Sequence, residues 1–313
     1  MSTPSQSLEQ LRAQLAGHTG YLAAAGFEGE LRTELGEVTA TYGRLMLAPG
    51  PPRPAAWACN TWLDPQVLAC ESIGQGAKAL RSLQRNWVHY PYSCHRRAAL
   101  LEQKLPHVSG RPLRFPEPAI RAPLGSWTLL DQHTVLAATQ CSSWFPNGEV
   151  AFEEDRSQPP NRAYLKLWEA LTLTEEKPGE GDLCLDLGSS PGGWTWVLQS
   201  LGARVVSVDK APLDPRIANL PGVTFQQGSA FAIDPQELGE IDWLVCDIAC
   251  YPGRLLEMVQ RWLAAGTCQR FVCTIKLQGD TDHDTVRRFA ELPGGRLRHL
   301  HHNKHELTWF GGV

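Results

Sequence analysis

The sequence predicts an α/β protein in which a smaller α+β domain precedes a mostly parallel sheet. Short apolar runs alternate with helical patterns from residue 183 onward, which is typical of a parallel sheet with helices on both faces. The first of these runs leads into a glycine-rich turn. Ahead of them, shorter segments end at a polar, proline-containing linker over 156–160. We therefore expect one domain over 1–155 and a second over 156–313.

The composition is that of an ordinary globular protein. The chain has 313 residues, 42% of them hydrophobic and 20% charged, which is enough for two domains with a sizeable core. The net charge of −4 provides no general attraction to nucleic acid, so any such attraction must be local. No apolar run approaches the ~20 residues that span a bilayer, and no signal peptide is visible. We expect a cytoplasmic protein without membrane contact.

The cysteines and histidines do not predict a metal site. The nine cysteines are scattered, and several lie in apolar runs, which is typical of reduced, buried thiols. No two CxxC motifs pair with each other. A group of histidines near the end of the chain has no acid or cysteine at ligand spacing, so we expect them on the surface or facing RNA: His299, His301, His302 and His305.

The amino-terminal part of the chain predicts a small α+β unit. Leucine spacing predicts a helix over 8–15, and a strand over 21–23 leads into a helix over 27–35. Alternating residues predict a hairpin over 38–47. Two further paired strands are expected on either side of residues 131–133.

Residues 78–121 form the basic part of the chain, with only Glu102 and Glu117 as acids. Basic side chains neutralise phosphates, and aromatic rings stack on unpaired bases at about 1–3 kcal/mol per base. The alternative is a solvated helix face followed by a loop whose aromatic rings belong to the core. We favour RNA contact through seven cations, Lys78, Arg81, Arg85, Arg96, Arg97, Arg111 and Arg114, which lie among the rings of Trp87, Tyr90, Tyr92 and Phe115.

The rest of the chain is organised around residues 183–210. A short apolar run reaches Asp186, the turn Gly-Ser-Ser-Pro-Gly-Gly follows, and a helical run leads to a second apolar run that ends on Asp209. This is the first βαβ half of a nucleotide-binding α/β fold, whose ligand lies at the carboxyl ends of the strands. Glycine lets the backbone approach a ligand closely, and an acid after the second strand can bind both hydroxyls of an adenosine ribose.

The details of the turn indicate the ligand. A dinucleotide site has the pattern GxGxxG and a P-loop carries a lysine-serine pair; this turn has neither, which disfavours an oxidoreductase with the same fold. A turn without a phosphate cradle suits S-adenosylmethionine, a cation without phosphate. We expect it to contact Asp186, Gly188, Ser189, Ser190, Pro191, Gly192, Gly193, Trp194 and Asp209, and further along the chain Ser229 and Asp247.

Four charged residues are expected to meet at the same edge of the sheet. Asp247 and Lys276 end successive buried strands, and Lys166 lies on a helix expected over 161–169, before the sheet. After a strand expected over 296–302, Glu306 begins the final strand. Burial of an isolated charge is unfavourable by several kcal/mol, so these groups need partners or water. Ordinary ion pairs at the rim of the sheet would explain any one of them, but not all four beside a methyl-donor site.

Together these motifs resemble the FtsJ-like ribose 2′-O-methyltransferases, which carry a Lys-Asp-Lys-Glu tetrad in this order. The resemblance covers residues 161–310 and rests on the segments DLGSSPGGW, RAYLKL, CDI, IKL and ELT. It implies a Rossmann-like domain with a final antiparallel strand. Within the family it is greatest to enzymes that act on a cytidine ribose in large-subunit ribosomal RNA. Residues 26–28, Gly-Phe-Glu, resemble the start of the THUMP-type RNA-binding domain of those enzymes.

By position, the resemblance implies that Lys276 is the general base toward a ribose 2′-hydroxyl. Asp247 and Lys166 would orient it and the substrate, and Glu306 would hold a lysine in place. A free lysine amine has a pKa of about 10.4 and is mostly protonated at neutral pH. We expect Lys166 and desolvation to favour the neutral amine, while the carboxylates fix its geometry. The predicted function is S-adenosylmethionine-dependent 2′-O-ribose methylation of RNA, with ribosomal RNA as the substrate.

One position departs from the pattern. Many methyltransferases place an acid after the third strand to bind the adenine amino group, and this chain has Ser229 there. Adenine would then be held by Ser229 or by backbone groups, or the cofactor would bind weakly. The alternative function is a catalytically silent RNA-binding protein that keeps the methyltransferase fold. The intact tetrad argues against that alternative.

Overall fold

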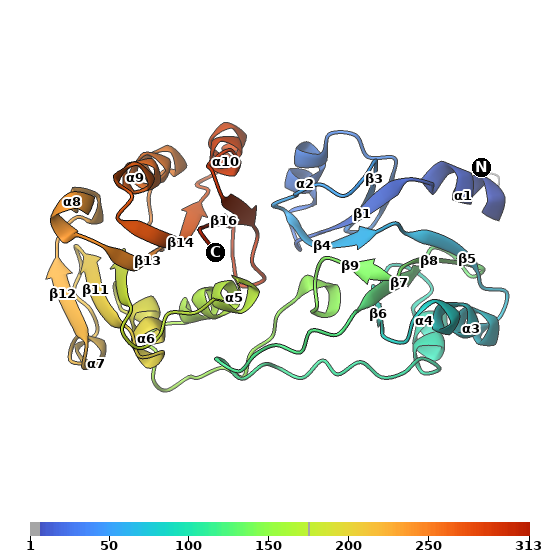
Figure 1. Cartoon of the computed structure of the whole chain (residues 1–313). Helices are drawn as coiled ribbons and strands as arrows, with labels where there is room; N and C mark the ends of the chain where they lie inside the picture. The colour runs from blue at the N-terminus through green and yellow to red at the C-terminus, as the bar shows by residue number, and fades with distance from the viewer. Residues whose placement is uncertain (1–6, 175) are drawn as a thin grey trace. The chain divides into compact units, whose positions relative to one another are not determined.

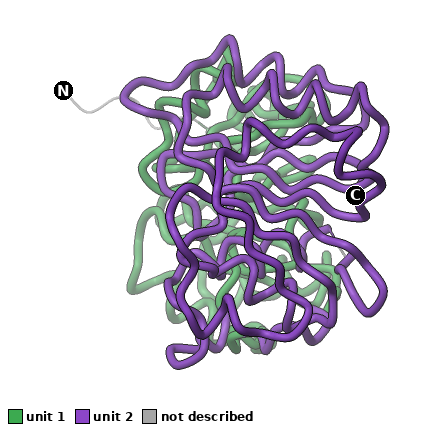
Figure 2. The backbone as a smooth tube through the Cα atoms, turned by 90° about the vertical axis from the view of Figure 1, so that its left-hand side faces the viewer, with its two compact units in different colours: residues 1–112, 120–151 green, residues 113–119, 152–313 purple. Residues whose placement is uncertain are grey.

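The chain passes repeatedly between two units, each with its own core (Figure 2). The computed structural model describes residues 7–174 and 176–313. Unit 1 contains the described residues up to Pro112 and Ile120–Ala151, and unit 2 contains Leu113–Ala119 and Phe152–Val313. The domain division at residues 155 and 156 stays a prediction, and residues 1–6 of the first predicted domain lie outside the described residues.

The described residues of unit 1 form two sheets and four α-helices. The five-stranded sheet has the order β2-β3-β1-β4-β9, with β1 His18–Ala23, β2 Ala40–Tyr42, β3 Leu45–Pro49, β4 Ala58–Leu63 and β9 Gln140–Cys141. The four-stranded sheet has the order β5-β8-β7-β6, with β5 Gln66–Ala69, β6 Trp87–His89, β7 Gly125–Leu129 and β8 Thr134–Ala138. The helices are α1 Leu8–Leu15, α2 Glu28–Leu35, α3 Ile73–Leu83 and α4 His95–Glu102.

Local sequence explains most of unit 1. Ser7 begins α1 with a capping box, in which its side chain accepts from the backbone N–H of Gln10 and the Gln10 side chain accepts from the backbone N–H of Ser7. The predicted hairpin is the antiparallel pair β2–β3, and the strands predicted around residues 131–133 are the antiparallel pair β7–β8. Their apolar residues pack into buried clusters that include Trp62 and Trp127.

Unit 2 is a seven-stranded sheet with helices on both faces (Figure 1). The strand order is β12-β11-β10-β13-β14-β16-β15, with β10 Leu183–Leu187, β11 Arg204–Asp209, β12 Val223–Gln227, β13 Ile241–Cys246, β14 Cys268–Lys276, β15 Gly295–Arg298 and β16 Glu306–Gly311. The helices are α5 Tyr164–Thr174, α6 Gly193–Ser200, α7 Pro215–Ala218, α8 Pro235–Leu238, α9 Pro252–Ala265 and α10 His283–Ala290. In Figure 1, α9 and α10 cover one face and α5 and α6 the other.

The strand order brings the predicted site together. Strands β10 to β14 run parallel, and β16 is antiparallel to both of its neighbours, which confirms the mostly parallel sheet with a final antiparallel strand. The backbone N–H of Asp247, just after β13, donates to the carbonyl of Leu187 at the end of β10 at 3.2 Å. Lys276, at the end of β14, lies opposite Glu306 in β16.

Several elements differ in length from the prediction. The strand expected over 21–23 begins at His18. The strand expected over 296–302 ends at Arg298, because the backbone N–H groups of His301 and His302 donate to the Glu169 carboxylate and not to a neighbouring strand. The helix expected from Asn161 begins at Tyr164, because the Asn161 side chain accepts from the N–H of Ala163 in a local turn. In the part of the chain that the structure describes, no helix combines the length and apolarity needed to cross a membrane.

Candidate active site

The glycine-rich turn between β10 and α6 is held against the second strand. The N–H of Gly188 donates to the carbonyl of Val208 at 2.9 Å, and the N–H of Ser190 donates to the Asp209 carboxylate at 3.0 Å. Gly188 has a φ of +80°, and a Cβ there would lie 2.5 Å from the side chain of Ile248. No other residue fits this position, so the turn brings bare backbone to the edge of the sheet.

A cavity of about 540 Å³ opens at the carboxyl ends of the parallel strands. Five of the residues predicted to bind a cofactor line it: Gly188, Ser190, Asp209, Ser229 and Asp247. The remaining predicted ones, all within the described chain, are not among its lining residues: Asp186, Ser189, Pro191, Gly192, Gly193 and Trp194. Its wall also includes features that sequence reasoning missed, such as the Arg254 guanidinium, which lies 3.9 Å from the centre of the Phe231 ring.

Asp186 lies beneath the turn and is only 1% exposed. One carboxylate oxygen accepts from the Thr195 hydroxyl at 2.7 Å, and that hydroxyl also lies 2.7 Å from the hydroxyl of Ser207. The other oxygen has no hydrogen-bond partner among the described residues. Burial raises the pKa of Asp186 to about 7, against the opposing effect of the Thr195 hydrogen bond. Asp186 therefore supports the turn from inside the core.

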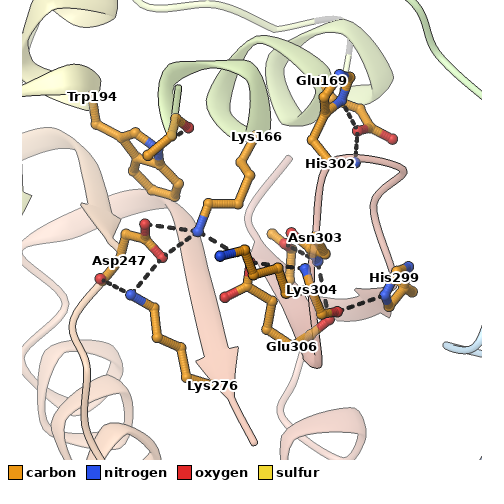
Figure 3. Close-up of polar contacts among 12 residues, drawn as sticks. Lys166, Glu169, Trp194, Asp247, Lys276, His299, His302, Asn303, Lys304 and Glu306 are labelled. Atoms are coloured by element: carbon orange, nitrogen blue, oxygen red, sulfur yellow. Dashed lines mark hydrogen bonds and ion pairs between the residues drawn. The ribbon is translucent and has the colours of Figure 1, made fainter. Parts of the chain in front are cut away.

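Four charged side chains meet beside this cavity (Figure 3). Lys166 of α5 donates from Nζ to both carboxylate oxygens of Asp247 at 2.8 Å and to Oε1 of Glu306 at 3.1 Å. Nζ of Lys276 donates to the backbone carbonyl of Asp247 at 2.6 Å and lies 3.2 Å from its Oδ1. The structure thus brings together the four residues that the sequence predicted to meet.

The two lysines differ in exposure. The side chain of Lys166 is 10% exposed and lies between Asp247 and Glu306, whose side chains are 14% and 9% exposed. The Lys276 side chain is 27% exposed and lines the cavity. Lys166 is therefore placed to hold the carboxylates, whereas the Lys276 amine is the one that a bound molecule can reach.

Comparison with known proteins identifies this part of the chain. The sequence profile of the family described as FtsJ-like methyltransferase matches residues 159–287, which contain the glycine-rich turn, Lys166, Asp247 and Lys276. Unit 2 contains an FtsJ-like methyltransferase domain. The resemblance predicted from the motifs is confirmed.

Curated relatives of this domain share the name ribosomal RNA large subunit methyltransferase M. The relative from Halorhodospira halophila is 36% identical over 172 residues, which are 52% of this chain and 50% of that protein. The relative from Thauera aminoaromatica is 32% identical over 188 residues, or 55% and 50%, and one from Xylella fastidiosa is 37% identical over 165 residues, or 48% and 46%. The chain spans about half the length of the curated relatives it matches.

A second charged residue of α5 supports this site from behind and was not foreseen. Glu169 lies one helical turn after Lys166, and its side chain is 2% exposed. It accepts from the N–H groups of His301 and His302 at 2.7 and 3.0 Å and from Nδ1 of His302 at 2.7 Å. Figure 3 shows it holding the turn that leads to Glu306. Only its position three residues after Lys166, on the same helix face, could have indicated it.

Three of these histidines, His299, His302 and His305, make side-chain hydrogen bonds within the fold, whereas His301 is exposed, as expected. His299, expected on the surface, is only 5% exposed, because its Nε2 is within 2.9 Å of the Lys304 carbonyl inside the turn. Burial lowers the pKa of His299, so the ring stays neutral. His305 lies 2.9 Å from the hydroxyl of Thr281. Within residues 7–174 and 176–313, no group of His, Cys, Asp and Glu side chains is arranged to hold a metal ion.

The predicted RNA-binding cations are divided between the units. Lys78 and Arg81 are exposed on α3, Arg96 and Arg97 lie on α4, and Arg85 and Arg111 are exposed in loops of unit 1. Arg97 donates to the carbonyl of Cys70 at 2.8 Å. Arg114 belongs to unit 2, where it pairs with Glu153 at 2.7 Å.

The aromatic rings of this region are mostly part of the core. Trp87 and Tyr90 are 3% and 4% exposed, and Phe115 stacks on Trp168 in unit 2 with ring centres 5.0 Å apart. Of the four rings only Tyr92 is exposed, at 37%. The prediction that bases stack on Trp87 and Tyr90 is therefore wrong, because these rings are buried in the core of unit 1.

Proposed function

We propose that the chain is an S-adenosylmethionine-dependent methyltransferase that modifies ribose 2′-hydroxyls of RNA, with ribosomal RNA as its substrate class and the cytoplasm as its location. The observation that carries this proposal is the reachable amine of Lys276, fixed by Asp247 at the wall of the cavity. The FtsJ-like domain and the names of its relatives support this proposal.

The cavity suits the proposed cofactor. Its volume of about 540 Å³ lies within the usual range of small-molecule sites, and the Asp209 carboxylate in its wall complements a cation. Each Asp209 oxygen accepts one backbone N–H, from Ser190 or Ala211, and keeps capacity for a ribose hydroxyl. Ser229 offers a hydroxyl in place of the usual acid. When bound, S-adenosylmethionine supplies an electrophilic methyl group on a positively charged sulfur.

Lys276 would act as the general base. In its neutral form the amine accepts the proton of the 2′-hydroxyl as the oxygen attacks, and it later releases this proton to water. The carbonyl and carboxylate of Asp247 aim the amine, and Lys166 holds that carboxylate through both oxygens. Glu306 holds Lys166 from the other side. Fixed alignment of the attacking oxygen supplies much of the catalysis in an in-line displacement.

RNA would be positioned by cations outside the cavity. The cations on α3, on α4 and in the adjoining loops of unit 1 would contact phosphates, as in a THUMP-like RNA-binding domain: the exposed Lys78, Arg81, Arg85, Arg96 and Arg111, and the partly exposed Arg97. Arg114, although paired with Glu153, is exposed and would contact RNA from unit 2. The alternative, a silent RNA-binding protein, is favoured only by Ser229.

The test is transfer of labelled methyl from S-adenosylmethionine to large-subunit ribosomal RNA transcribed in vitro, which carries no modification. We expect label in 2′-O-methyl nucleosides. Lys276→Ala should lower the rate by about 100-fold or more, the usual contribution of a general base, without changing the affinity for S-adenosylhomocysteine. Lys276→Arg should change the pH–rate profile as well, because arginine stays protonated at all accessible pH values.

Lys177→Ala is the matched control, because this lysine is also in unit 2 and does not line the cavity. It should transfer methyl at the wild-type rate. A pH–rate profile unaffected by Lys276→Arg would contradict the assigned base. Tight binding of S-adenosylhomocysteine with no transfer by the wild type to this RNA or to total RNA would favour the silent RNA-binding protein.

A further inference from the structure

One aromatic side chain of unit 2 stands out in solution. Tyr251 is 71% exposed. Among the described residues of unit 2 it is the only exposed large hydrophobic side chain, since the others, Leu83, Tyr92, Leu100 and Ile120, belong to unit 1. A single exposed apolar ring is ordinary on a protein surface. Its location is what gives it meaning.

Tyr251 lines the same cavity as Asp247 and Lys276. It lies four residues after Asp247, on the segment that connects β13 to α9. In this wall Lys276 carries the amine of the proposed base, and Tyr251 carries the most exposed ring. A molecule that presents a hydroxyl to Lys276 therefore has this ring as a neighbouring apolar surface.

The backbone of Tyr251 is fixed although its ring is exposed. The residue is the N-cap of α9, with φ −67° and ψ 142°, and its carbonyl accepts from the N–H groups of Arg254 and Leu255 at 3.1 and 3.3 Å. N-caps are usually serine, threonine, aspartate or asparagine, whose side chains accept from the first turn. Tyr251 makes no such side-chain bond. The tyrosine side chain thus does not cap the helix, which indicates that the ring has a different role.

We infer that the Tyr251 ring stacks on the base of the nucleotide whose ribose is presented to Lys276. Single-stranded RNA is generally held by stacking of unpaired bases on aromatic rings, and every base offers a flat face to such a ring. Among its described residues, unit 2 has one exposed large hydrophobic ring for this purpose, and it lies at the cavity of the proposed base. This inference rests on the proposed function for the identity of the substrate as RNA.

The adenine of the cofactor is the competing occupant of this ring. Three of the groups proposed to bind the cofactor, Gly188, Asp209 and Ser229, lie at or just beyond the ends of β10, β11 and β12. Tyr251 instead lies on the segment that follows β13 and Asp247, and the neighbouring strand β14 ends at Lys276. The topology therefore associates Tyr251 with the reacting hydroxyl and its base.

The experiment compares Tyr251→Ala, Tyr251→Phe and Tyr251→Trp in methyl transfer to in vitro transcribed large-subunit ribosomal RNA. Tyr251→Ala should raise the KM for RNA roughly 5- to 100-fold, the range that corresponds to one stacked base. Phenylalanine and tryptophan keep a ring and should restore a KM close to that of the wild type. The affinity for S-adenosylhomocysteine, measured by calorimetry, should be the same in all four proteins.

Two results would overturn the inference. An unchanged KM in Tyr251→Ala would mean that no base stacks there. A loss of S-adenosylhomocysteine affinity in Tyr251→Ala, restored in Tyr251→Phe, would assign the ring to the adenine of the cofactor.

Photocrosslinking separates this inference from the proposed function. The wild type is irradiated with the same RNA containing 4-thiouridine, in the presence of S-adenosylhomocysteine, and the crosslinked residue is mapped by mass spectrometry. A crosslink at Tyr251 without methyl transfer would support RNA contact at this ring and contradict the proposed activity. Methyl transfer without a crosslink, and with an unaffected Tyr251→Ala variant, would support the proposed activity and contradict RNA contact at this ring.

Discussion

Lys166 illustrates how one residue can organise a charged site. Its ammonium group lies between Asp247 and Glu306 and neutralises two carboxylates that would otherwise repel each other in a poorly solvated place. Asp247 is thereby free to direct its remaining interactions toward Lys276. The reachable amine depends on a buried one that a bound substrate need never touch.

Asp186 gives a prediction about stability and pH. The pKa of its carboxyl is raised by burial from 3.8 to about 7, so between these values the folded chain holds a proton that the unfolded chain has lost. This contribution therefore makes the folded state less stable as pH rises from about 4 to about 7, and the loss is complete above that range. The amide in Asp186→Asn cannot titrate, so this variant should lack the pH-dependent loss of stability.

The measurement is the free energy of unfolding in urea for both proteins between pH 4 and 8. The difference in favour of Asp186→Asn should grow with pH by roughly 3 to 4 kcal/mol in total. Thr195→Val, which removes the hydroxyl that donates to Asp186, should enlarge the pH-dependent loss. Parallel curves for wild type and Asp186→Asn would contradict the raised pKa.

At the scale of residues, the positions of charged side chains could be predicted where a charged residue directly follows an apolar run. Asp247 and Lys276 each follow an apolar run, so their approach could be predicted from the parallel order of strands alone. Asp186 has the same pattern, yet it is buried away from the cavity. The difference depends on side-chain direction: Asp186 belongs to its strand, whereas Asp247 lies just beyond its own.

At the scale of elements, the turn between β15 and β16 is fastened to α5 at two points. Glu169 binds the backbone of His301 and His302, and Lys166 binds Glu306 where β16 begins. Asn303, between them, donates to the carbonyl of Glu306 at 3.1 Å. The position of Glu306 therefore depends on Glu169, which touches none of the other three charged residues through a hydrogen bond in the described chain.

We predict that Glu169→Ala releases this turn. Two backbone N–H groups and the His302 ring lose their acceptor, so hydrogen exchange of the amides of residues 299–305 should become faster by at least tenfold, the equivalent of about 1.4 kcal/mol. The kcat for methyl transfer should fall with Glu306 displaced, whereas the affinity for S-adenosylhomocysteine should hold, because Glu169 does not line the cavity.

Glu169→Gln serves as the graded comparison, because the amide keeps one acceptor oxygen and should retain part of the protection. Wild-type exchange rates in Glu169→Ala would show that the turn is held by other contacts. This turn also marks the limit of prediction for elements. Apolar runs indicated each strand of the sheet, but β15 ends early because of an acceptor 132 residues away in the chain, and local pattern carries no information about it.

At the scale of the whole molecule, a short segment of the chain's first half belongs to unit 2. This segment is residues 113–119, which in the sequence come between two stretches that belong to unit 1. Phe115 stacks on Trp168 at an interplanar angle of 15°, Leu113 bridges to Phe152, and Lys177 donates to the carbonyl of Pro116. The segment covers the helix that carries Lys166 and Glu169, since Trp168 lies between those residues in α5.

Phe115→Ala should therefore destabilise unit 2. Loss of a half-buried aromatic pair is expected to lower its free energy of unfolding by about 1–2 kcal/mol. Thermal unfolding of the full chain, followed with and without S-adenosylhomocysteine to identify the transition of unit 2, measures the effect. Glu117→Ala, an exposed position on the same segment, is the matched control. Equal melting temperatures for all three proteins would contradict this role of the segment.

The assignment of residues 113–119 could not be predicted from the sequence. A proline-containing polar linker indicated a boundary near residue 156, because linkers have a local composition. Membership of a seven-residue segment in the later unit is decided by contacts such as that between Phe115 and Trp168, which are distant in the chain. Hydrophobic periodicity reports local structure, and it does not report which core a connecting segment joins.

This arrangement constrains how the two units could be exchanged during evolution. A gene fusion that joins a new amino-terminal module at residue 152 would leave behind the piece that packs on Trp168. A recombinant that includes residues 113–119 would keep the segment that packs on Trp168, but it would also contain residues 120–151 of the original unit 1. Unit 2 is therefore encoded by two separate stretches of sequence, and a single genetic crossover cannot transfer both of them without residues 120–151 of unit 1.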